Sequence, residues 1–170
     1  MPIRALAKVW GAKMQLGFSI VGVVFLAMLF VPNVMWAKRR PPGYEELSGR
    51  EDKALLVLER AGQALATASA VVFVCPQGLS WPWALWLVAA FLLMLLYEVA
   101  WARYFRGGER LDGMYRPLGP IPVPIASLPV AALALLGVWC QSPVTVLAAA
   151  ILGVGHVGIH LGHLRELSAR

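Results

Sequence analysis

Five long apolar runs decide the kind of fold that this chain can adopt. They lie at residues 16–36, 54–74, 83–101, 121–139 and 144–164. A helix needs about 20 apolar residues to cross the hydrocarbon core of a bilayer, and each run is close to that length. Because backbone groups in lipid must be paired internally, such segments are expected to be helical. We therefore predict an all-α, polytopic transmembrane bundle of about five spans, in a single domain over residues 1–170.

The composition also indicates a membrane protein. Of the 170 residues, 59% are hydrophobic and only 14% are charged, whereas a soluble domain has about 45–50% apolar and about 25% charged residues. The net charge of +6 favours cytoplasmic loops and anionic head groups. The basic residues form no nucleic-acid-binding motif, so we expect membrane lipids and no nucleic acid as partners.

The first 36 residues resemble a signal peptide but lack its cleavage site. Basic and apolar residues alternate over residues 1–14, which predicts a short amphipathic helix at the lipid interface. No small-residue cleavage site follows the first apolar run, so we predict a retained first helix. Pro32 and Asn33 predict a kink or an unwound last turn in this helix, and Pro129 predicts a kink in the fourth span.

Lysine and arginine positions predict the orientation of the chain. With the N-terminus outside, the first loop, the third loop and the C-terminal tail place five, four and two basic residues in the cytoplasm, eleven in all. The two other turns carry no charge, as the positive-inside rule expects of outer turns, and only the three basic residues before residue 14 oppose the assignment. We predict an external N-terminus and a cytoplasmic C-terminus.

Short uncharged turns join spans two and three and spans four and five. They predict a pair of helical hairpins beside the first helix. One turn contains Cys75 and the other contains Cys140. Both turns are assigned to the outer side, where an oxidising compartment permits a disulfide; the alternative is two unpaired thiols in small apolar turns.

The last span contains the only three histidines of the sequence, His156, His160 and His163. On a helix they lie one turn apart on one face. Imidazoles are costly in an apolar span, so they indicate either an inward-facing functional site or packing residues near the membrane surface. Their spacing also allows a metal site, although it lacks the glutamate of a zinc protease motif.

Glycines form a smooth surface beside these histidines. Gly155, Gly158 and Gly162 share a face on which another backbone could approach closely. Because five short helices enclose little volume, we predict a homodimer built on this face.

Other polar side chains interrupt the second and third spans. Glu59 and Gln63 share a helical face, and Arg60 is adjacent to them, which indicates either an inward-facing network or a helix that begins outside the membrane. Glu98 lies within the third run and needs a partner such as Arg60, Arg103 or a histidine.

In the predicted topology these polar residues fall in the cytoplasmic half of the bundle or at its boundary, on four of the five helices. They are Asn33, Glu59, Arg60, Gln63, Glu98, Arg103, His156, His160 and His163. The simplest arrangement that gives these side chains polar partners is one shared pocket that opens to the cytoplasm. We therefore expect Glu59 or Glu98 to lie within direct or water-mediated hydrogen-bonding reach of His156 or His160.

Short stretches over most of the chain resemble known sequences. They are Val31-Pro32-Asn33, Gly43-Tyr44-Glu45, Leu58-Glu59-Arg60-x-Gly62, Leu96-Tyr97-Glu98, Arg103-Tyr104-Phe105, Pro122-Val123-Pro124, Leu128-Pro129-Val130 and Gly155-His156-x-x-Ile159-His160. Together they resemble a group of small, uncharacterised bacterial integral membrane proteins. The resemblance implies a bacterial inner membrane and attaches no activity.

Three functions are compatible with this pattern. The first is binding or transport of a small molecule or ion, with the glutamate and histidine cluster coupled to protons. The second is a membrane-embedded enzyme acting on a lipid or isoprenoid, with a histidine or Glu98 as general base. The third is a metal or haem protein, although bis-histidine haem would need a dimer or a second type of ligand. The sequence identifies neither a cofactor nor a catalytic residue.

Overall fold

The computed structural model describes residues 15–75 and 79–169, and it is helical apart from two strands of two residues each. Five longer helices form a bundle: α2 (Ile20–Ala37), α4 (Lys53–Val72), α5 (Ala84–Arg106), α7 (Pro124–Trp139) and α8 (Pro143–Ser168). The short helices α3 (Tyr44–Ser48) and α6 (Leu111–Met114) lie in the two charged loops. The predicted amphipathic helix at residues 1–14 lies outside the described residues.

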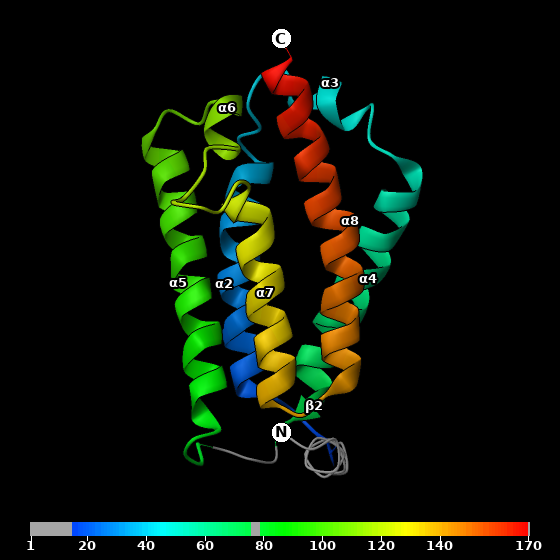
Figure 1. Ribbon diagram of the computed structural model, residues 1–170, viewed down its shortest axis with the longest axis vertical. Coiled ribbons are helices and arrows are strands. Elements are labelled where there is room, and N and C mark those ends of the chain that lie inside the picture. Colours follow the sequence, from blue (N-terminus) through cyan, green and yellow to red (C-terminus); the bar gives the residue numbers. More distant parts are fainter. Residues whose placement is uncertain (1–14, 76–78, 170) are drawn as a thin grey trace.

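The charged segments gather at one end of the bundle. Figure 1 shows α3, α6 and the C-terminal end of α8 together, which we call the polar end. Strand β2 (Phe73–Val74) and the turn between α7 and α8 lie at the opposite end, which we call the turn end. Neighbouring long helices along the chain therefore run in alternating directions, as a multi-pass membrane protein requires.

Four helices, α2, α4, α5 and α8, are long and apolar enough to cross a membrane. Their outward surfaces carry large apolar side chains, such as Val88, Leu92 and Leu147, which are each more than half exposed. Apolar surface of this extent marks a membrane or a protein interface. Helix α7 is apolar but has only 16 residues, so the fifth span stays a prediction.

Capping residues decide where the helices begin. The Ser19 side chain accepts a hydrogen bond from the Gly22 amide, and that of Asp52 accepts hydrogen bonds from the first turn of α4. The first helix consequently starts at Ile20, later than the predicted residue 16. Residues Gln15–Leu16 instead form strand β1, which pairs with β2 in an antiparallel ladder.

The predicted bounds also differ elsewhere, and α7 begins at Pro124 rather than at residue 121. Helix α5 continues to Arg106 and α8 to Ser168, so both extend into segments that we expected to be loop and tail. Helix α2 continues through the buried Pro32 to Ala37. Its last turn is therefore helical rather than unwound.

Helix packing differs from the predicted pair of hairpins. Helix α4 packs mainly against α8, α5 packs against α7, and α7 packs against α8. Figure 1 shows α4 and α5 on opposite sides of the bundle, so these consecutive helices do not form a packed hairpin. Helices α7 and α8 do pack against each other. Helix α2 contacts α4, α5 and α7 and so encloses the space between them.

A disulfide bridge at the turn end joins the segment that follows α4 to the end of α7. It links Cys75, which follows β2, to Cys140, the C-cap residue of α7. Nearby, the indole N–H of Trp83 donates to the Trp139 carbonyl at 2.7 Å. These contacts attach the N-terminal part of α5 and the segment after α4 to the end of α7.

Candidate functional site

A cavity of about 320 Å³ lies among the long helices, in the half of the bundle nearer the polar end. Its polar wall is formed by residues that sequence analysis had grouped: Asn33, Glu59, Gln63, His156 and His160. The rest of the wall is aromatic and aliphatic: Leu29, Phe30, Trp36, Ala37, Tyr44, Trp101, Met114, Ile125, Pro129, Val130, Leu133 and Leu152. An apolar enclosure with a few polar groups is typical of a small-molecule site.

Two glycines let α4 and α8 approach closely beside this cavity. A Cβ atom on Gly155 of α8 would lie 2.3 Å from the backbone nitrogen of Glu59. Reciprocally, a Cβ atom on Gly62 of α4 would lie 2.3 Å from the backbone nitrogen of Leu152. Only glycine fits at such positions. The close approach places Glu59 directly opposite His156, the residue that follows Gly155.

The glycines of α8 therefore form part of its contact with α4 of the same chain. A Cβ atom on Gly158 would also contact α4, at 3.2 Å from the Leu55 side chain, whereas one on Gly162 would meet no atom within 4 Å. The predicted dimer face is wrong at Gly155 and Gly158, because α4 of the same chain occupies it.

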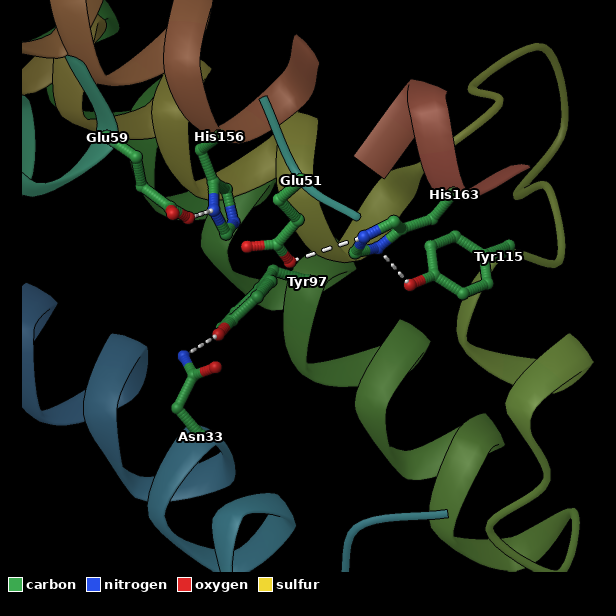
Figure 2. Close-up of polar contacts among 7 residues, drawn as sticks. All are labelled: Asn33, Glu51, Glu59, Tyr97, Tyr115, His156 and His163. Atoms are coloured by element: carbon green, nitrogen blue, oxygen red, sulfur yellow. Dashed lines mark hydrogen bonds and ion pairs between the residues drawn. The ribbon is translucent and has the colours of Figure 1, made fainter. Parts of the chain in front are cut away.

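Glu59 and His156 form the central polar pair of the cavity. The Glu59 Oε1 atom lies 2.5 Å from His156 Nδ1 (Figure 2), and both side chains are about three-quarters buried. This is one of the contacts that sequence analysis expected between a carboxylate and the last span. The pair therefore places a carboxylate and an imidazole in direct contact in the cavity wall.

A second buried pair involves His163. Its Nδ1 atom lies 2.8 Å from the Tyr115 hydroxyl, and its Nε2 atom lies 3.2 Å from Glu51 Oε1 (Figure 2). The latter distance is that of an ion pair, although the atoms are not aligned as in a hydrogen bond. Burial raises the pKa of Glu51, and the neighbouring Glu59 carboxylate raises it further. Burial likewise raises the pKa of Tyr115.

His160 lies between the two pairs. Its ring centroid is 4.6 Å from that of His156 and 5.9 Å from that of His163, and the side chain is buried. The three imidazoles thus form a continuous row along α8. The row runs from Glu59 at the cavity to Glu51 in the loop that precedes α4.

Four residues predicted for the pocket do not line it, and one of them is His163, whose contacts are given above. Arg60 is exposed on α4. Glu98 is half-buried on α5, and its Oε1 atom has no hydrogen-bond partner among the described residues. Arg103 donates to the carbonyl groups of Pro117 and Arg116 near the polar end. The partners suggested for Glu98 therefore do not reach it.

Sequence analysis missed several polar contacts that involve loop or aromatic residues. Asn33 Nδ2 donates to the Tyr97 hydroxyl at 2.8 Å, which joins α2 to α5 beside the cavity (Figure 2). Sequence analysis assigned no contact to Glu51 or to Tyr115. Their side chains lie outside the apolar runs, where nothing in the spacing of residues indicates burial.

The three histidines do not form a metal site. Within residues 15–75 and 79–169, no group of three or more histidine, cysteine, aspartate or glutamate side chains is placed to hold a metal ion. His156 and His163 each face a different carboxylate, so the imidazoles do not converge on a common point. The three-histidine metal site that the spacing allows is therefore not formed by these side chains in the described part of the chain.

Comparison with known proteins gives no assignment: no family model, curated protein or solved structure matches the chain.

Proposed function

We propose that this protein binds a small molecule in the cavity between its helices and couples that binding to protonation of the Glu59–His156 pair. The observation that carries the proposal is the 2.5 Å contact between these side chains in the wall of an otherwise mainly apolar cavity. Ionisable groups at membrane depth are costly and usually mark the path of a substrate or proton.

The cavity limits the size and character of the ligand. Its volume of about 320 Å³ is at the lower end of the range of about 300–1,000 Å³ for ligand sites. At about 30 Å³ per water-sized group, it accommodates a ligand of about ten non-hydrogen atoms. Phe30, Trp36, Tyr44 and Trp101 provide the aromatic contacts, and the Glu59–His156 pair provides the ionisable one.

The histidine row supports coupling to protons. A ligand that displaces Glu59 from His156, or neutralises it, changes how strongly the imidazole holds its proton. The proton then has a short route from His156 past His160 to His163 and Glu51. That route leads toward the polar end of the bundle, where the charged loops lie.

In this proposal the polar end faces the cytoplasm of a bacterial cell. The basic residues of the first loop, the third loop and the tail gather there, as the positive-inside rule expects. The disulfide lies at the turn end, on the side that is oxidising in such cells. A reporter fused after residue 170 should therefore be cytoplasmic, and an external reporter signal would contradict the assignment.

Ligand binding can be tested by thermal shift on the purified protein in detergent. The probes are neutral, cationic and anionic metabolites of about ten non-hydrogen atoms, each tested at pH 6 and pH 8. We expect a binder whose stabilising effect depends on pH in the wild type. The effect should be lost, or become independent of pH, in Glu59→Gln and His156→Asn.

The matched control is Glu98→Gln, which neutralises a carboxylate in a long helix outside the cavity. It should bind like the wild type, with the same pH dependence. If binding is unchanged in Glu59→Gln, or weakened equally in Glu98→Gln, the cavity pair is not the coupling group.

A further inference from the structure

A second cavity, of about 520 Å³, lies at the polar end between the C-terminal ends of α5 and α8 and the segment around α6. It shares no lining residue with the cavity that contains Glu59. Its charged lining residues are Arg103, Arg110, Arg116 and Asp112, and Leu164 and Leu167 of α8 supply apolar wall.

The charges in this cavity do not balance. Arg110 Nε donates to Asp112 Oδ1 at 3.1 Å, so one arginine is neutralised by the only acidic lining residue. The charges of Arg103 and Arg116 have no acidic counterpart in the wall, which leaves a formal charge of +2. A concave surface lined by one sign of charge attracts a ligand of the opposite sign.

Hydrogen bonds hold the two unmatched arginines near each other. Arg103 is half-buried at the end of α5, and its Nη1 atom donates to the Pro117 carbonyl at 2.8 Å. Its Nη2 atom donates to the carbonyl of Arg116. These bonds fix the segment that carries Arg116 against α5, and both arginines line the cavity.

Helix dipoles oppose an anion here but do not outweigh the arginines. The C-terminal ends of α5 and α8 each contribute about half a negative charge. Together they offset about one of the two unmatched positive charges, so the cavity keeps an attraction for anions. A guanidinium group is well suited to phosphate because it can donate two parallel hydrogen bonds.

We propose that this cavity binds a phosphate group, carried by the head group of an anionic membrane lipid. The cavity lies at one end of helices long enough to cross a membrane, where head groups are found. Basic pockets between helix ends are recognised sites for such head groups. Leu164 and Leu167 lie beside the arginines and provide a surface for the adjoining part of the lipid. The assignment does not depend on the function proposed for the first cavity.

The test is binding of phosphatidylglycerol, phosphatidylcholine and inorganic phosphate to the purified full-length protein in detergent, measured by native mass spectrometry and by competition. We expect phosphatidylglycerol to bind more tightly than phosphatidylcholine, with an affinity that falls as salt increases. Arg103→Gln combined with Arg116→Gln removes the two unmatched positive charges and should weaken phosphatidylglycerol binding at least tenfold. Asp112→Asn removes the competing carboxylate and should strengthen it.

The control variant combines Lys38→Gln with Lys53→Gln, which removes two charges from exposed positions at the same end. It should bind phosphatidylglycerol like the wild type. Circular dichroism checks that each variant is folded. The proposal is overturned if the two lipids bind equally well or if the arginine variant binds phosphatidylglycerol like the wild type. It is also overturned if the lysine control weakens binding as much as the arginine variant does. If inorganic phosphate displaces phosphatidylglycerol at equal concentration, the lipid assignment is overturned and the ligand is soluble phosphate.

Discussion

Replacing Gly155 by alanine should separate α4 from α8 and break the pair at the centre of the cavity. The new Cβ atom would lie 2.3 Å from the Glu59 nitrogen and 2.6 Å from the Leu55 carbonyl oxygen. Both are backbone atoms of a helix, so neither can rotate away. Ordinary contact begins at 3.4 Å, and the helices must therefore move apart by about 1.1 Å at this point.

The energetic cost has two parts. Overpacking of this kind costs about 1–3 kcal/mol. The same displacement lengthens the 2.5 Å contact between Glu59 and His156 beyond hydrogen-bonding distance, and loss of a hydrogen bond to a charged group costs about 1.5–3 kcal/mol. Alanine regains up to about 1 kcal/mol through its higher helix propensity. We therefore expect Gly155→Ala to lower the free energy of unfolding by about 1.5–6 kcal/mol.

The assay is reversible unfolding in mixed detergent micelles, followed by circular dichroism. Gly162→Ala is the matched control, because it makes the same change on the same helix at a position where a Cβ atom meets nothing within 4 Å. It should leave stability unchanged or raise it by up to about 1 kcal/mol. If Gly155→Ala unfolds like Gly162→Ala, the close approach of α4 and α8 does not hold the site together.

Three further predictions concern the remaining contacts. Tyr115→Phe keeps the ring but removes the hydroxyl that contacts His163. It should lower the free energy of unfolding by about 1–3 kcal/mol in the same assay, and a variant as stable as the wild type would contradict a role for that hydrogen bond. Reducing the Cys75–Cys140 bridge, which spans a sequence separation of 65 residues, should lower the unfolding free energy by about 2–4 kcal/mol; an unchanged midpoint in reductant would argue against it. Because burial raises the pKa of Glu51, the folded state holds this proton more tightly than the unfolded chain. The stabilisation is complete below the ordinary carboxyl pKa and is lost as pH rises through the raised value. The wild type should therefore lose stability relative to Glu51→Gln as pH rises above the ordinary carboxyl pKa, and a constant difference would contradict the shift.

The contact between Glu59 and His156 could be anticipated because a charged group at membrane depth needs a partner. The same argument was applied to Glu98, and there it did not identify a contact. Both glutamates interrupt apolar runs, so their sequence environments are alike. They differ in what packs against the surface of the helix that carries them. The surface of α4 that carries Glu59 packs against α8 at two glycines, whereas Glu98 lies on α5 outside the cavity.

By itself, the sequence determined the helical class, the approximate position of each long helix and the segments that gather at the polar end, because these depend on local composition and length. It also indicated that Gly155 and Gly158 allow a close approach. The tertiary structure decided which backbone approaches, and it is α4 of the same chain rather than a second copy. Glycines on one helix allow close contact with any helix that has small residues at the contact, so they do not specify the partner. Here α4 is the partner because its Gly62 lies where the backbone of α8 approaches. The burial of Glu51 and Tyr115 against His163 likewise depends on how the loops fold over the helix ends, which residue spacing does not encode.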